Sequence, residues 1–273
     1  MSLVWDGALT TAVGFGLAMA VSILLSSLFV EAPYGKLGGN DSIAVGKIKI
    51  PELSLNPRLG WFLMELPATV SFTYFYFQGP NAFQPLPLVF AALFYVHYAN
   101  RGFYFPYNIR VANSQAKQNY SLVVVVMGWV VTGLHGYISG RWYSDVNTNL
   151  LSPELFLQSP SFLLGFLVYE FGFWFTVHSE AIVRNLRTGA PGEAKYKIPR
   201  GGGFEYVTNA PYFFELTAWL GFALMTLNPG GVVIFCISFA NLVPRAFTVH
   251  KWYQDKFKDE YPKERKVIVP FII

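Results

Sequence analysis

The chain has 273 residues, of which 53% are hydrophobic and only 13% charged, with a formal net charge of +4. Soluble proteins usually carry about 25% charged residues, so this composition excludes an ordinary soluble domain. Apolar runs of about 20 residues recur along the chain, and each could cross a hydrocarbon core roughly 30 Å thick. The one cysteine, Cys236, excludes an intramolecular disulfide and a cysteine-clustered metal site. We therefore expect an all-α integral membrane protein without a metal.

The apolar runs predict seven transmembrane helices. In chain order they cover about residues 8–30, 59–79, 86–106, 120–140, 160–182, 212–228 and 230–250. The first run is expected to be retained, because no basic region or small-residue cleavage site precedes it. The helix breaker Asn228-Pro229-Gly230-Gly231 separates the last two runs. Residues 1–273 are thus expected to form one seven-span domain.

The distribution of basic residues predicts the orientation. Of the 20 Lys and Arg residues, only Arg141 falls on the side of the predicted N-terminus, and the other 19 fall on the opposite side. The positive-inside rule then places the N-terminus outside and the C-terminus in the cytosol. The membrane would be a bacterial inner membrane or the endoplasmic reticulum. Within the long first cytosolic loop, residues 45–50 alternate apolar and polar, which indicates a short strand or an interfacial segment.

Ionisable residues inside predicted spans are candidate functional residues, because charges in a bilayer are costly. At a rise of 1.5 Å per residue, Glu65 and Tyr98 lie about 9 and 12 Å from the cytosolic face. Most of the others fall within two turns of that face, which predicts a polar pocket open to the cytosol. The full set is Glu65, Arg101, Glu170, His178, Glu180, Glu215 and Arg245, with the neutral polar residues Tyr98, His135 and Asn241.

Some of these residues have plainer interpretations. Glu170 fits a packed structural carboxyl or a partner for Arg141 better than a catalyst. His135, beside two glycines, fits a hydrogen-bonded core histidine, and Arg101 could extend to the interface. Glu65 is different, because its neighbours are apolar and desolvation favours a protonated carboxyl that can donate a hydrogen bond.

Soluble nucleotide-binding motifs are missing from the sequence. It contains no strand–GxGxxG–helix unit, P-loop, HExxH or GxSxG pattern, and nothing in it indicates nucleic-acid binding. A phosphate-rich ligand could still form charge-assisted bonds with cytosolic basic residues. Contact with lipid headgroups is the alternative for the same residues, which are Arg184, Arg187, Lys197, Arg200 and Arg245.

Motifs from residue 30 to the end form a joint pattern. The C-terminal part comprises Pro244-Arg245-Ala246-Phe247, His250, Trp252-Tyr253, Phe257, Tyr261-Pro262, Arg265 and Pro270-Phe271-Ile272-Ile273. Before it stand His178-Ser179-Glu180, Tyr196-Lys197-Ile198-Pro199, Gly201-Gly202, Tyr206-Val207 and Glu215. The N-terminal part comprises Tyr34-Gly35-Lys36, residues 61–68 (WFLMELPA), and Val96-His97-Tyr98 with Arg101. The pattern resembles that of the steroid 5α-reductases, membrane enzymes that reduce 3-oxo-Δ4 steroids with NADPH.

The resemblance implies roles for individual residues. Glu65 and Tyr98 would hold the steroid 3-carbonyl as catalytic residues. NADPH would bind the C-terminal half, about residues 160–273, through Glu180, Arg184, Arg187, Tyr196, Asn209, Glu215, Asn241, Arg245, His250 and Tyr253, together with Tyr34. Thr176 and Pro211 stand where close relatives have asparagine, which changes individual cofactor contacts.

The expected chemistry agrees with the residues. Hydride addition to an enone places negative charge on the carbonyl oxygen, and two fixed donors would stabilise it as an oxyanion hole does. A protonated carboxyl beside a tyrosine serves this purpose in ketosteroid isomerase. The alternatives are reduction of another lipid, such as a polyprenol or a trans-2-enoyl thioester, and an isoprenylcysteine-type methyltransferase. The latter would use S-adenosylmethionine and would not need Glu65 and Tyr98. A channel or receptor would leave the polar cluster unexplained.

Overall fold

Long helices dominate the computed structural model, which describes residues 6–27, 42–45, 48–51, 53–110, 120–146, 153–188, 190, 194 and 196–273. Tyr34 lies outside the described residues. Helices occur at all seven predicted positions, so this part of the prediction is confirmed. They are α1 (Gly7–Ser27), α2 (Pro57–Tyr76), α3 (Pro85–Tyr98), α5 (Leu122–Arg141), α7 (Pro160–Asn185), α8 (Ala210–Thr226) and α9 (Pro229–Phe257).

Short elements connect and extend these helices. The π-helical turn η2 (Ala99–Tyr104) and α4 (Phe105–Asn108) continue α3, and η3 (Trp142–Val146) continues α5. The other short helices are α6 (Pro153–Leu157), η5 (Gly202–Glu205) and η6 (Lys258–Glu260). Strand β1 (Ser42–Val45) pairs antiparallel with β2 (Ile48–Pro51), and β3 (Ser54–Leu55) pairs with β4 (Tyr120–Ser121). The segment predicted as a short strand or an interfacial segment, residues 45–50, therefore contains strand at its two ends: Val45 is the last residue of β1 and Ile48 the first of β2, while residues 46–47 lie outside the described residues.

Four helical segments are long and apolar enough to cross a membrane by length and composition. They are Gly7–Ser27, Leu122–Asp145, Pro160–Asn185 and Pro229–Glu260. Two of the remaining predicted spans are shorter α-helices, since α3 has 14 residues before the π-helical turn and α8 has 17. The structure thus fits an all-α membrane protein, while the crossing of all seven segments stays a prediction.

Proline and side-chain caps explain where several helices begin. Pro57, Pro160 and Pro229 stand in the first turn of α2, α7 and α9, where a missing N–H costs nothing. The side chain of Asn56 accepts from the N–H of the second helical residue at 2.9 Å. Asn228 does the same for α9 at 2.8 Å, so the predicted breaker is the cap that starts this helix.

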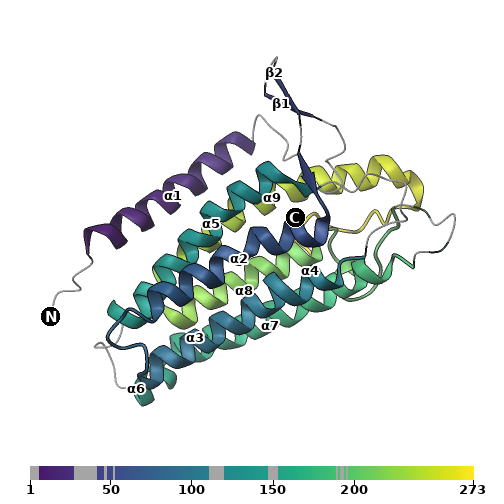
Figure 1. Cartoon of the computed structure of the whole chain (residues 1–273). Coiled ribbons are helices and arrows are strands. Elements are labelled where there is room, and N and C mark those ends of the chain that lie inside the picture. The colour runs from purple at the N-terminus through teal and green to yellow at the C-terminus, as the bar shows by residue number, and fades with distance from the viewer. Residues whose placement is uncertain are drawn as a thin grey trace.

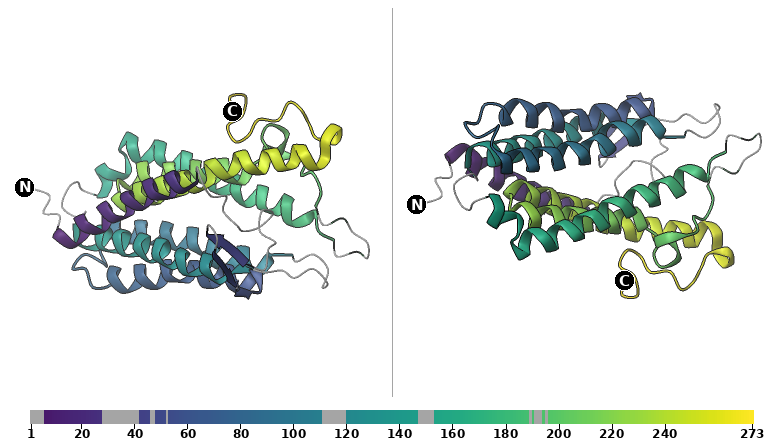
Figure 2. Two further views of the ribbon diagram at one scale, coloured as in Figure 1. Left: turned by 90° about the horizontal axis from the view of Figure 1, so that it is seen from above. Right: turned by 90° about the horizontal axis from the view of Figure 1, so that it is seen from below.

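The helices form two layers that meet in the centre of the molecule (Figure 1). Figure 2 shows α2, α3 and α5 on one side and α7, α8 and α9 on the other, with α1 beside α9. Small residues permit close approach within each layer. A Cβ added to Gly136 of α5 would lie 2.4 Å from the carbonyl oxygen of Ala68, and one on Gly172 of α7 would lie 2.3 Å from the nitrogen of Ala218. Such contacts are typical of helix pairs in membranes.

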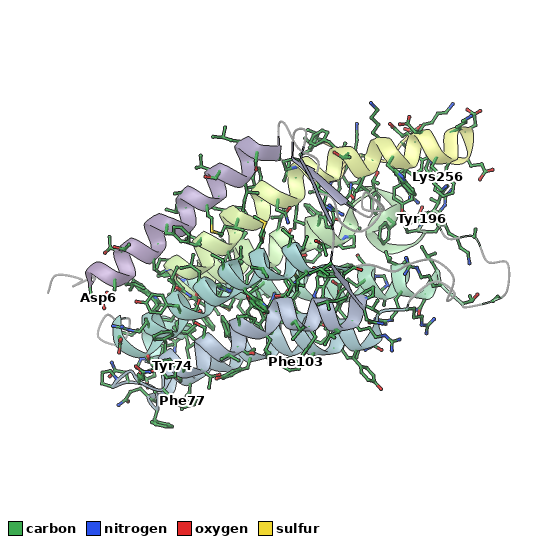
Figure 3. The ribbon with its side chains drawn as sticks, turned by 45° about the horizontal axis from the view of Figure 1, so that its top comes forward. Asp6, Tyr74, Phe77, Phe103, Tyr196 and Lys256 are labelled. Carbon is green, nitrogen blue, oxygen red and sulfur yellow. The ribbon has the colours of Figure 1, made fainter. Side chains whose placement is uncertain are left out.

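A group of ion pairs around Arg141 lies at one end of the bundle. Arg141 contacts the carboxylate of Asp6 at 2.8 Å and also pairs with Asp145. A hydrogen bond from the Leu9 N–H, together with Arg141, holds the pKa of Asp6 below its usual value. Figure 3 shows Asp6 and Phe77 at this end, and Tyr196 and Lys256 at the opposite end.

Candidate active site

Arg101 is the centre of a buried cluster that joins the two layers. Its guanidinium lies 3.2 Å from a carboxylate oxygen of Glu65 on α2. It lies 2.9 Å from a carboxylate oxygen of Glu215 on α8 and donates a second bond to that residue at 3.2 Å. Glu180 on α7 is farther away, at 3.9 Å. One arginine therefore holds three carboxyl groups that come from three different helices.

The cluster carries more acidic than basic groups. The four side chains, on Glu65, Arg101, Glu180 and Glu215, are only 6–18% exposed. Full ionisation would give one positive and three negative charges in a place that water barely reaches, and uncompensated buried charge is expensive. The single charge of Arg101 cannot compensate three ionised carboxyl groups. A protonated carboxyl can donate a hydrogen bond, which an ionised one cannot.

Local backbone structure places Arg101. It lies on the π-helical turn η2, a distortion that often occurs at functional sites. The guanidinium lies 4.9 Å from the ring of Trp61, whose Nε1 donates to the Arg101 carbonyl at 3.2 Å. A Cβ added to the next residue, Gly102, would lie 3.4 Å from the Cβ of Glu65, so η2 packs closely on α2 at this point. The sequence offers two interpretations of Arg101, as a member of the polar pocket or as a residue that extends to the interface, and its contacts with three carboxyl groups favour the first.

Tyr98 lies one turn before Arg101 and is buried between the layers. Its hydroxyl oxygen is 2.8 Å from Nδ1 of His135 on α5. The ring of Trp219 on α8 lies 5.2 Å from that of His135, centroid to centroid, and perpendicular to it. The two predicted catalytic residues lie in the same part of the molecule, because Arg101 contacts Glu65 and follows Tyr98 by one helical turn.

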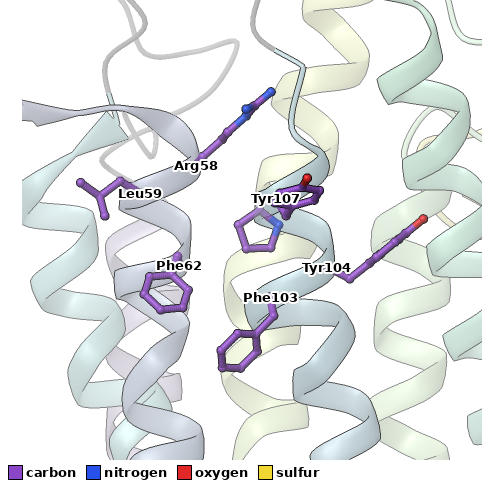
Figure 4. Close-up of a pocket in the computed structure, with 7 residues that line it drawn as sticks. Arg58, Leu59, Phe62, Phe103, Tyr104 and Tyr107 are labelled. Atoms are coloured by element: carbon purple, nitrogen blue, oxygen red, sulfur yellow. The ribbon is translucent and has the colours of Figure 1, made fainter.

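Two hollows lie beside this cluster. A small cavity is lined by His97, Asn100, Arg101, Phe173, Thr176, Glu215 and Ala218. A larger groove of about 560 Å³ lies between α2 and the η2–α4 segment, with walls that are almost entirely apolar. Figure 4 shows Phe62 from α2 facing Phe103 from η2, and the two rings are 5.6 Å apart. Phe62 precedes Glu65 by one helical turn, so the groove lies close to the cluster.

Two of the arginines predicted to bind the cofactor lie at the C-terminal end of α7. Arg184 follows Glu180 by one turn of α7. Arg187 donates to the carbonyl of Arg110 at 2.6 Å, and Arg110 donates back to the carbonyl of Arg187 at 3.2 Å. These bonds attach the end of α7 to the segment that follows α4.

A second group of predicted cofactor residues lies on α9 or packs against it. Nε of Arg245, a buried residue, donates to the Tyr212 hydroxyl at 3.0 Å. Tyr253 is buried against Tyr261, with ring centroids 5.6 Å apart. Tyr196 lies under Lys256, whose Nζ is 5.6 Å from the tyrosine ring. Asn241 is half-buried on the same helix, one turn before Arg245.

Two predicted cofactor residues make bonds inside the protein. The side-chain nitrogen of Asn209 donates to the carbonyls of Ala246 and Val267, both at 3.0 Å. His250 contacts the Thr208 hydroxyl through Nδ1, and its Nε2 lies 2.9 Å from the side chain of Gln254. Both residues therefore hold the N-terminal end of α8 against the C-terminal part of the chain.

Other sequence-based interpretations can now be compared with the structure. His178 is exposed on α7, and no described contact joins it to the cluster. Glu170 accepts a bond from Trp174 at 2.7 Å, which agrees with a structural role, and Arg141 pairs with two aspartates instead. His135 is a hydrogen-bonded core histidine, as interpreted from the sequence, and its partner is the predicted catalytic residue Tyr98. The contacts of Trp61 with Arg101 and of Trp219 with His135 were not predicted, because the sequence does not show which partner an aromatic residue in a span will contact.

Metal ligands do not gather in the described part of the chain: no three His, Cys, Asp or Glu side chains there are placed to hold an ion. The absence of a metal remains an expectation from the sequence.

Comparisons with known proteins show a consistent similarity. Residues 84–273 match the family model described as 3-oxo-5-alpha-steroid 4-dehydrogenase. The chain is 36% identical over 256 residues to a steroid 5-alpha-reductase DET2 from Gossypium hirsutum, covering 93% of each protein. It is 36% identical to 3-oxo-5-alpha-steroid 4-dehydrogenase 1 from Rattus norvegicus, covering 93% of this chain and 92% of the relative. The human protein of the same name is 33% identical, covering 86% and 85%.

Proposed function

Because the chain belongs to the 3-oxo-5-alpha-steroid 4-dehydrogenase family of oxidoreductases, we propose that it reduces the Δ4 double bond of 3-oxo-Δ4 steroids to give 5α-steroids. The observation that supports this most is that two buried side chains suited to donate to a carbonyl oxygen lie close together: Glu65 inside the Arg101 cluster and Tyr98 one helical turn before Arg101. Family membership does not agree with the methyltransferase alternative. Reduction of a different lipid by the same residues is the alternative that the experiment below tests.

The chemistry follows from the polarity of the enone. Hydride adds to the β-carbon, the double bond shifts, and negative charge collects on the carbonyl oxygen. A proton then binds the α-carbon, so the product has gained two hydrogen atoms. The Glu65 carboxyl, in its protonated form, and the Tyr98 hydroxyl would both donate to the oxygen while its charge grows. Preorganised donors of this kind in a site without water contribute more than they would in solution.

The residues fit a nicotinamide dinucleotide phosphate, which supplies the hydride when bound. Arg184 and Arg187 at the end of α7 and Arg245 on α9 offer guanidinium groups suited to phosphates. The carboxyl groups of Glu180 and Glu215 can accept bonds from hydroxyl or amide groups. Tyr196, Asn241 and Tyr253 would complete the site. We propose NADPH as the cofactor, bound from the cytosolic end of the bundle.

The apolar groove supports a route for the substrate. Its walls combine side chains of α2 with those of η2 and α4, and Arg58 and Tyr107 lie among its lining residues. A steroid dissolved in the bilayer could contact this groove without crossing water. The charged cofactor would arrive from the opposite environment, the cytosol. Such a division explains why a reductase of this kind has its catalytic residues within the membrane-spanning part.

The direct test is to incubate the purified protein with NADPH and testosterone or progesterone, and then to measure the product mass. A gain of two hydrogens, abolished when the cofactor is omitted, is the expected result. Reduction of a polyprenol or an enoyl thioester with no change in either steroid would refute the assigned substrate class. The control variant Glu170→Ala should give the same product as the wild-type protein, because this α7 carboxyl bonds only to Trp174 among the described contacts.

A second prediction concerns the cytosolic arginines. Loss of a charge-assisted hydrogen bond costs on the order of 1.5–3 kcal/mol, so Arg187→Ala or Arg245→Ala should weaken NADPH binding about tenfold or more. Steroid affinity should change little. Binding can be measured by titration of NADPH fluorescence. Lys263→Ala is the control, because this side chain is 80% exposed at the same end of the bundle. NADPH affinity within twofold of wild type in both arginine variants would show that the residues serve another purpose.

The proposed topology has seven spans, with the N-terminus outside and the C-terminus cytosolic. Single cysteines at Phe83 and Lys263 test it in a Cys236→Ser background, because both side chains are about 80% exposed. A reagent that cannot cross membranes should label Phe83→Cys from outside and Lys263→Cys only after the vesicles are opened. Equal labelling of both variants in sealed vesicles would contradict the topology. The Cys236→Ser protein itself should remain unlabelled.

A further inference from the structure

The two ring nitrogens of His135 have different surroundings. Nδ1 lies 2.8 Å from the Tyr98 hydroxyl oxygen, whereas Nε2 is buried with no hydrogen-bond partner among the described residues. Aromatic rings surround the imidazole, with Phe94 and Trp219 at centroid distances of 5.3 and 5.2 Å. The side chain is fully buried. Among the described residues, His135 therefore has one polar contact, and that contact is with the proposed catalytic hydroxyl of Tyr98.

The number of hydrogens on each group decides whether Tyr98 or His135 should be the donor in this hydrogen bond. A tyrosine hydroxyl has one hydrogen to donate, and its oxygen can also accept a bond. A neutral imidazole has one N–H and one bare nitrogen. If Tyr98 gave its hydrogen to Nδ1, none would remain for the ketone oxygen of a substrate. If Nδ1 carries the hydrogen, His135 donates to Tyr98 and the tyrosine hydrogen stays available.

We propose that His135 is a positioning residue, present as the Nδ1–H tautomer, that donates to Tyr98 and directs the tyrosine's own hydrogen towards the substrate oxygen. This inference rests on the proposed function. In this tautomer Nε2 carries no hydrogen, so no N–H is buried without an acceptor. The bonds from His135 to Tyr98 and from Tyr98 to the substrate point the same way, and each polarises the next as charge grows on the oxygen.

The tautomer can be measured without turnover. The chain has four histidines, so ¹⁵N NMR of histidine-labelled protein gives few signals, and the loss of one pair in His135→Asn assigns His135. A hydrogen on Nδ1, in protein without substrate, is expected. A hydrogen on Nε2 instead would overturn the proposal. That outcome would not affect the assignment as a steroid reductase, which depends on product mass.

Kinetics separate a positioning role from a packing role. Asparagine places an amide nitrogen near the position of Nδ1, whereas phenylalanine fills the space without any N–H. We expect His135→Phe to lower kcat about tenfold, as loss of one hydrogen bond does, and His135→Asn to retain more activity. A packing role predicts the reverse order, because asparagine leaves a cavity. In a Tyr98→Phe background, His135→Phe should cause little further loss, and NADPH affinity should stay constant in every variant. An additional tenfold loss in that background would refute the role assigned here.

Discussion

Glu65→Ala should lower steroid turnover about 10²–10³-fold, as removal of one oxyanion-hole donor does in other enzymes. The reason lies in the location of the carboxyl, which is 5% exposed and held at the interface of the two helical layers. No water can easily replace the missing donor there. Glu65→Gln keeps the shape and an N–H donor, so it should retain part of the activity. Steady-state kinetics with saturating NADPH measure both changes.

Tyr98→Phe provides the second half of this test. Both residues are proposed to act on one oxygen, so the double variant should lose less than the product of the two single losses. Tyr95→Phe is the matched control, because that hydroxyl lies one turn away on α3 and contacts Thr73 at 2.8 Å. NADPH affinity should remain near wild type throughout. Glu65→Ala with more than about half of wild-type turnover would disprove the enolate-stabilising role.

Arg101→Met should destabilise the protein by about 3–5 kcal/mol, because it leaves buried carboxyl groups without their cation. The apparent Tm in detergent should fall by roughly 10 °C, since each kcal/mol is worth about 2–4 °C in a protein of this size. Arg141→Met is the comparison at the other end of the bundle. Its ion pairs with Asp6 and Asp145 are more exposed, so the loss should be about 1 kcal/mol or less.

A double-variant cycle identifies the partner that matters most. Glu215 makes two contacts with Arg101, at 2.9 and 3.2 Å, whereas Glu180 makes one at 3.9 Å. Replacement of both members of a buried pair by apolar residues removes the uncompensated charge. Arg101→Met combined with Glu215→Leu should therefore be more stable than Arg101→Met alone. If the two losses simply add, Arg101 is not the group that neutralises Glu215.

The amino-acid sequence by itself determined where the helices lie and how far apart their polar residues are along each helix axis. Apolar runs reveal helix positions because a buried backbone must form its own hydrogen bonds, and proline and asparagine mark the ends. The cap at Asn228 and the helices at all seven predicted segments follow from these local rules. The separation of two residues along a helix also follows, because each residue adds a fixed 1.5 Å. The family resemblance came from local motifs as well, and the comparisons confirm it.

Only the tertiary structure decided which polar residues meet. Residues at one depth can face any direction, since the rotation of each helix and its neighbours depend on packing between segments far apart in the chain. His178 is exposed, whereas Glu180, two residues later, lies in the Arg101 cluster. The contact between Tyr98 and His135 joins α3 to α5 and depends equally on their rotation. Close approach at Gly136, where a side chain would collide with α2, helps to set that rotation for α5.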